Sequence, residues 1–138
     1  MAFTVDIVSA EQSLWSGSAE FLVVPGSQGE LGIHGGHAPL LTYMKSGDVA
    51  IRDEEGRIHH FYISGGVLEV QPNGVIVLAD ASTRAQDLDE AAILKAKAEA
   101  EEMLRSKHDR LSYAEIEIRL SQEISKLQTI EKYRSSRK

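Results

Sequence analysis

The sequence contains no cysteine among its 138 residues. This absence excludes disulfide bridges, thiolate metal sites and a cysteine nucleophile, and it fits a reducing compartment. Long apolar runs are also missing, because no stretch approaches the roughly 20 residues that a helix needs to cross a bilayer. The first residues carry neither a basic nor an apolar segment, so we expect no signal peptide. We therefore expect a soluble chain with no direct membrane insertion.

With 42% hydrophobic residues, the chain can form a core. Positive charge is scarce, and the formal net charge is −6. Because nucleic-acid binders carry a basic face, no nucleic-acid partner is expected. The basic residues gather late in the chain, where residues 107–138 have a balance of +3, against −6 for residues 1–86 and −3 for residues 87–106. These cations either complement a helix dipole, which composition favours, or dock on an acidic partner.

Residues 3–80 have the pattern of short strands separated by turns. Apolar and polar residues alternate over residues 3–8, and short apolar runs follow at regular spacing. The turns at residues 53–56 and 71–74 end in glycine, which accepts the positive φ of a hairpin. This pattern predicts an antiparallel β-sandwich or a flattened barrel. We place this domain at residues 1–86, ending in a polar connector at residues 82–86.

Residues 87–138 change to the pattern of helices. Asp87 with Glu90, and Ser112 with Glu115, form two capping-box signatures. Two helices joined by a short polar loop predict an antiparallel hairpin, with the second helix running to about residue 133. The apolar stripe of the second helix consists of Tyr113, Ile116, Leu120, Ile124 and Leu127.

No catalytic constellation stands out in the sequence. Five glycines between residues 26 and 36 lack the lysine and the helix of a phosphate loop, so we interpret them as turn residues. His59 and His60 are neighbours on a strand and point to opposite faces, which argues against a shared metal; we predict no metal site. Glu30 and His37 flank the glycines, as solvated loop side chains or as a polar contact patch.

Four segments together resemble a known family. They are residues 7–11, 30–42 (ELGIHGGHAPLLT), 64–70 and 77–80. In this order and spacing they closely resemble the epsilon subunits of bacterial F-type ATP synthases, and the match runs essentially from end to end. The resemblance implies a β-sandwich of about ten strands followed by a helical hairpin.

The resemblance also implies a role in the rotating central stalk. The chain would be a non-catalytic subunit that couples proton transport to ATP synthesis, as a peripheral protein on the cytoplasmic face of the bacterial inner membrane. Its expected partners are the gamma subunit, the c-ring, and the alpha and beta subunits of the catalytic head. Glu30 and His37 are expected to contact the c-ring, and no cofactor is expected.

In this family the hairpin folds against the sandwich or extends toward the catalytic head, where it blocks ATP hydrolysis. In the folded-down state we expect the hairpin to pack through Ile116, Leu120, Ile124 and Leu127. In the extended state we expect contacts with the head from Arg119, Lys126, Lys132, Arg134 and Arg137.

Some members of the family bind ATP through a motif of the form Ile/Leu-Asp-x-x-Arg-Ala. This chain keeps the acid as Asp89, but Ala92 stands where the arginine would meet phosphate. We therefore predict weak or absent ATP binding. Two other function classes compete with the stalk subunit: a stand-alone binding module that dimerises through the hairpin, and a small hydrolase, which the missing nucleophile and base disfavour.

Overall fold

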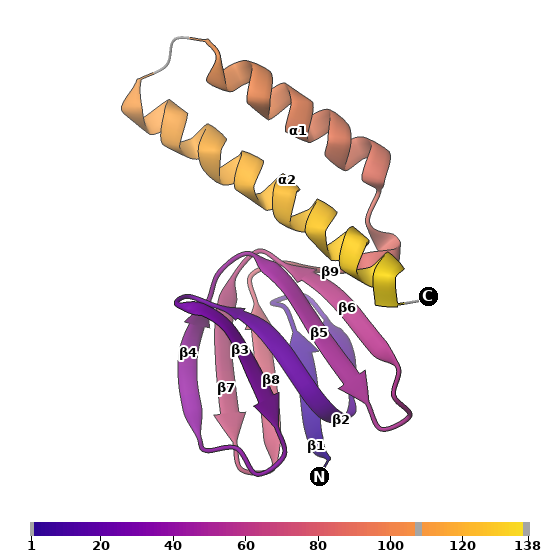
Figure 1. The fold of residues 1–138 in the computed structure, drawn as a ribbon. Helices are drawn as coiled ribbons and strands as arrows, with labels where there is room; N and C mark the ends of the chain where they lie inside the picture. The colour runs from indigo at the N-terminus through magenta and orange to yellow at the C-terminus, as the bar shows by residue number, and fades with distance from the viewer. Residues whose placement is uncertain (1, 107–108, 137–138) are drawn as a thin grey trace.

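The computed structural model describes residues 2–106 and 109–136, which form a β-sandwich with a helical hairpin on one end (Figure 1). Nine strands lie in the described part of the chain, in agreement with the expected number of about ten. The elements are β1 (Phe3–Val8), β2 (Ser13–Gly26), β3 (Gly29–His34), β4 (Leu40–Met44), β5 (Gly47–Asp53), β6 (Ile58–Ile63), β7 (Gly66–Gln71), β8 (Gly74–Ala79), β9 (Ser82–Arg84), the 3-10 turn η1 (Ala85–Asp87), α1 (Glu90–Leu104) and α2 (Arg110–Ser136).

The long strand β2 joins the two layers of the sandwich. Its residues 13–19 pair with β1, and its residues 21–26 pair with β3. The register of β2 against β5 shifts between Ala19 and Phe21, and such an irregularity lets one strand bend between two layers. The strand order is β1-β8-β7-β4-β2-β5-β6-β9, and because β1 also pairs with β2, the first five strands of this order close into a ring. The predicted sandwich or flattened barrel is therefore confirmed.

The strand pairings among the described residues are antiparallel, except that β1 runs parallel to β8. The core lies between the layers and is formed by alternate residues of each strand, because successive side chains of a strand point to opposite faces of the sheet. Its fully buried members include Val5, Ile7, Leu22, Val24, Val49, Ile51, Ile63, Leu68 and Val77.

The polar connector expected at residues 82–86 is wrong over its first part. Ser82–Arg84 forms β9, which pairs with the edge strand β6. The Arg84 guanidinium donates a hydrogen bond to the Leu14 carbonyl oxygen at 2.7 Å. Ala85 is then buried in the turn η1. The domain boundary placed at residue 86 falls inside this turn and stays a prediction.

The two helices begin at caps other than those predicted. Asp89, and not Asp87, caps α1, because its side chain accepts a hydrogen bond from the Ala92 amide at 3.1 Å. The carboxylate of Asp109 accepts from the Ser112 amide at 2.8 Å, so α2 begins two residues before the expected cap. Aspartate is as good an N-cap as serine, and the residue that reaches the free amides takes the position.

The helix α2 lies between α1 and the sandwich, over β5, β6 and η1 (Figure 1). Its buried residues are Ile116, Glu123, Thr129 and Ile130. This face overlaps the predicted stripe without matching it: Leu120 and Leu127 are half-buried, whereas Ile124 keeps 37% and Tyr113 44% of its exposure. The buried face differs because α2 contacts two surfaces, the sandwich on one side and α1 on the other.

Candidate functional site

Glu30 and His37, predicted as one patch, lie near the start of β3 and beyond its end, respectively. Glu30 is the second residue of that strand, and its side chain is 67% exposed. His37 lies in the loop that follows the strand's last residue, His34. A strand rises about 3.3 Å per residue, so the length of β3 separates the two side chains. The structure therefore does not bring these two predicted residues together.

His37 holds its own loop in place. Its two ring nitrogens face backbone carbonyl oxygens, one of His34 and one of Gln71, the latter at 2.8 Å from Nε2. The ring also packs edge-on against Phe3, with centroids 5.2 Å apart. These contacts fix the β3–β4 loop to the ends of β7 and β1. The side chain thus has a structural task besides any contact it makes with a partner.

Three of the five cations predicted to meet the catalytic head make ion pairs within the chain. Arg134 forms two hydrogen bonds with the carboxylate of Glu90, at 2.8 and 3.2 Å. Lys132 lies 3.5 Å from Glu30 on β3, so it connects the end of α2 to the sandwich. The third cation, Lys126, pairs with Glu123 at 3.1 Å. Of the other two, Arg119 is exposed, and Arg137 lies outside the described residues.

The contact between α2 and the sandwich contains a buried polar pair that the sequence analysis missed. His60 Nδ1 lies 2.9 Å from Asp48 Oδ2, and the two side chains keep only 7% and 5% of their exposure. Lys126 lies over the ring of Tyr62, 5.5 Å from its centroid. Thr129, one turn further along α2, is fully buried. No sequence signal marks Asp48 or His60, because an outward-facing polar strand residue is ordinarily solvated.

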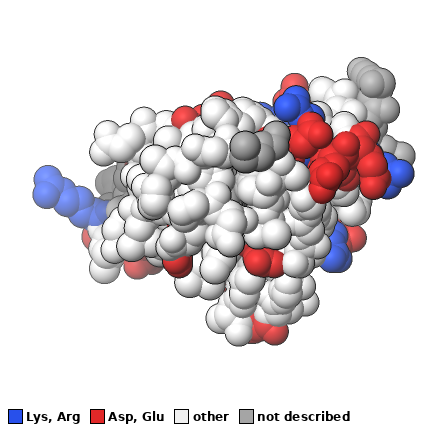
Figure 2. Space-filling view, turned by 90° about the horizontal axis from the view of Figure 1, so that it is seen from below, with Lys and Arg blue, Asp and Glu red and all other residues white. Residues whose placement is uncertain are grey.

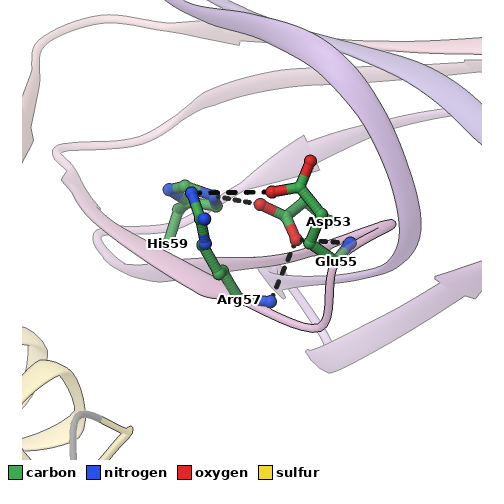
Figure 3. Close-up of polar contacts among 4 residues, drawn as sticks. All are labelled: Asp53, Glu55, Arg57 and His59. Carbon is green, nitrogen blue, oxygen red and sulfur yellow. Dashed lines mark hydrogen bonds and ion pairs between the residues drawn. The ribbon is translucent and has the colours of Figure 1, made fainter.

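The β5–β6 turn is organised by one carboxylate (Figure 3). Asp53 Oδ1 accepts hydrogen bonds from the amides of Glu55 and Arg57, both at 2.9 Å. His59 Nε2 lies 2.9 Å from Asp53 Oδ2. The hydrogen bond with His59 is the largest influence and lowers the pKa of Asp53 below its ordinary value of 3.8; desolvation opposes it, and the two amide hydrogen bonds lower the pKa further. His59 and His60 thus serve different carboxylates on opposite faces of β6, as predicted.

A face of large apolar side chains lies exposed on the outside of β4, β7 and β8. The register aligns Tyr43 with Val67 and Val67 with Leu78, so these three form one row across the strands. Tyr43 and Leu41 keep 73% and 71% of their exposure, and apolar faces of this kind mark docking surfaces. We call Leu41, Tyr43, Val67, Ile76 and Leu78 the outer apolar face.

Charge is unevenly distributed on the end of the sandwich opposite the hairpin. Figure 2 shows a broad surface without charge there, with acidic side chains gathered at one side. Within residues 2–106 and 109–136, no three His, Asp or Glu side chains come together in a way that could hold a metal ion. Neither described helix combines the length and the apolar character that crossing a membrane requires.

Comparison with known proteins gives a consistent result. Residues 2–85 match the family model of the ATP synthase delta/epsilon chain β-sandwich domain. The chain is 48% identical over 130 residues to the ATP synthase epsilon chain of Alkalilimnicola ehrlichii, covering 94% of this chain and 93% of that one.

Two solved structures share the fold. One is a chain from the cryo-EM structure of the Euglena gracilis mitochondrial ATP synthase (OSCP/F1/c-ring), with a TM-score of 0.81, 19% identity, and 89% and 78% of the two chains covered. The other comes from the central stalk and c-ring of the Tetrahymena thermophila mitochondrial ATP synthase, with a TM-score of 0.63, 12% identity, and 93% and 96% covered.

Proposed function

The chain belongs to the epsilon-chain family of ATP synthases, and on that premise we propose that it is a rotor subunit of the central stalk in an F-type enzyme. It couples proton transport to ATP synthesis without catalysing a reaction itself. The observation that carries this proposal is the 48% identity over 94% of the chain, which spans sandwich and hairpin alike. An independent binding module or a small hydrolase does not account for that match.

The outer apolar face is the proposed contact with the gamma subunit. The hairpin covers β5 and β6 and leaves this face of β4, β7 and β8 open. Tyr43→Asp should abolish co-purification with gamma, because a carboxylate would be desolvated in an apolar contact. Ile58→Asp is the matched control, since Ile58 is an exposed apolar residue on β6, outside this face. Equal binding of both variants would contradict the assignment.

For the c-ring, Glu30 and His37 remain the proposed contacts, with different tasks. Glu30 is exposed and charged, so it is suited to a direct polar contact. His37 is half-buried and acts by holding the loop in shape. We expect Glu30→Gln to weaken coupling without loss of stability, and His37→Ala to lower both. With this contact to the membrane sector the chain is a peripheral protein on the cytoplasmic face of the bacterial inner membrane.

The hairpin is proposed to inhibit ATP hydrolysis by extending to the alpha and beta subunits. Its cations would then exchange partners, because Lys132 and Arg134 are held by Glu30 and Glu90 in the folded-down state. A hairpin with two docked arrangements that differ by a few kcal/mol can be biased by its partners. In the folded-down arrangement, which the structure has, the predicted packing applies to Ile116, Leu120 and Leu127, whereas Ile124 stays exposed.

Truncation tests the inhibition directly. A chain that ends after residue 88 keeps β9 and the buried Ala85 of η1 but lacks both helices. In the assembled enzyme this truncation should leave ATP synthesis in place and raise ATP hydrolysis. If hydrolysis is no faster than with the full chain, the hairpin has no inhibitory function here.

A change in the inhibition of ATP hydrolysis can show whether Lys132 and Arg134 bind the catalytic head or only hold the folded-down state. The double variant Lys132→Gln with Arg134→Gln removes two ion pairs that hold the folded-down state. If these cations also bind the head, inhibition falls; if they serve only the folded-down state, inhibition rises because the hairpin is freed. Lys95→Gln is the matched control, because Lys95 on α1 is exposed, makes no ion pair with the described residues and is not among the cations predicted to meet the head.

A further inference from the structure

The contact between the hairpin and the sandwich is polar at its centre. The Asp48 and His60 side chains, on β5 and β6, keep 5% and 7% of their exposure. Thr129 on α2 is fully buried, although its side chain carries a hydroxyl. It lies one turn after Lys126, which contacts the Tyr62 ring, so both point to the sandwich side of α2.

Each of the three central side chains leaves one polar atom without a partner among the described residues. These atoms are Asp48 Oδ1, His60 Nε2 and Thr129 Oγ1, and each is almost fully buried. A buried polar group without a hydrogen bond loses its contacts with water, and no hydrogen bond within the protein offsets that free-energy cost. The charged groups around this centre have partners: Lys126 pairs with Glu123 on the same helix, and Lys132 pairs with Glu30 on β3.

We propose that this polar centre, defined as Asp48, His60 and Thr129, sets the docking equilibrium of the hairpin. It lowers the stability of the docked state, and release of α2 returns all three groups to water. The contact of Lys126 with the Tyr62 ring, the ion pair of Lys132 with Glu30, and the buried Ile116 and Ile130 hold the docked state against that loss. The inference rests on the proposed release of the hairpin and names the residues of this chain that tune it.

Replacing one member of the buried pair and replacing both should have opposite effects. His60→Phe alone leaves the Asp48 carboxylate buried without its partner, so the docked state should weaken. His60→Phe combined with Asp48→Leu removes both polar groups and should strengthen docking, because apolar replacement of a buried pair is often stabilising. Thr129→Val removes the unpartnered hydroxyl with almost no change of shape and should also strengthen docking.

The cysteine-free chain allows a direct measurement. Spin labels on cysteines introduced at the exposed positions Glu54 and Glu115 report the distance between sandwich and hairpin by double electron–electron resonance. The isolated full chain is measured at the urea concentration where docked and released populations of the unsubstituted chain are equal. Circular dichroism of each variant verifies that the sandwich and the helices remain folded.

Thr129→Val is expected to raise the docked-to-released ratio about fivefold or more, and His60→Phe to lower it about tenfold. The double variant should have a higher docked-to-released ratio than the unsubstituted chain. Thr42→Val on β4 should leave that ratio unchanged. An unchanged ratio for Thr129→Val, or a double variant below the unsubstituted chain, overturns the inference. Because this measurement needs no ATP synthase, its failure is distinct from a failure of the truncation experiment.

Discussion

Removing the ion pair between Arg134 and Glu90 is expected to weaken the closure of the hairpin by about 1 kcal/mol. The pair joins the last turn of α2 to the first turn of α1 through two hydrogen bonds of 2.8 and 3.2 Å. Its side chains are 62% and 40% exposed, so water screens the attraction and the value belongs to the range of surface pairs. The bidentate geometry places it at the upper end of that range.

A double-mutant cycle measures this value. Arg134→Ala, Glu90→Ala and the double variant are unfolded in urea, and the loss of helix is followed by circular dichroism. The pair Arg105–Glu102, which lies at the C-terminal end of α1 and is 70% and 75% exposed, provides the matched control, for which we expect about 0.3 kcal/mol. At 1 M salt both coupling energies should shrink. A coupling energy for Arg134–Glu90 no larger than that of the control would refute the reasoning.

Four further outcomes are expected. Gly66→Ala should cost about 3 kcal/mol or more of unfolding free energy, because its Cβ would lie 2.1 Å from the Leu78 carbonyl oxygen. Gly36→Ala should cost only about 1 kcal/mol, because Gly36 has a positive φ but open space around it. Equal losses of unfolding free energy in urea would contradict this. The lowered pKa of Asp53 stabilises the fold above pH 3.8 and loses that contribution as pH falls further, so the stability deficit of Asp53→Asn should shrink in acid; a deficit independent of pH speaks against it. Asp89→Ala should cost about 1 kcal/mol of unfolding free energy through loss of the cap. Titration calorimetry should find weak or absent ATP binding to the unsubstituted chain, and micromolar binding would overturn that prediction.

The sequence predicts the sandwich because its core residues alternate regularly along each strand, and this alternation depends only on local pattern. It misses β9 because Ser82–Arg84 has the composition of a connector, and only the free edge of β6 makes it a strand. The sequence predicts that each helix begins at a capping residue but misplaces the cap. Asp87 and Asp89 both precede α1, and α2 has both Asp109 and Ser112 near its start, so geometry selects one of two candidates.

The site was less predictable than the fold. The exposed cations were identified by charge, but their partners Glu30 and Glu90 lie 102 and 44 residues away in the chain, beyond any local pattern. Asp48 and His60 gave no signal, because their burial is produced by a helix that the strand sequence does not encode.

The pairing of β9 has a mechanical consequence. The strand is fixed by β6 and by the hydrogen bond from Arg84 to Leu14, and Ala85 is buried beside it. The backbone is free of helix or strand only at Leu88 and Asp89, both in extended conformation, before α1 begins. Any swing of the helices is concentrated in this two-residue pivot. Because α1 is about 22 Å long at 1.5 Å per residue, a 30° rotation there moves its far end by about 11 Å, while the sandwich stays still.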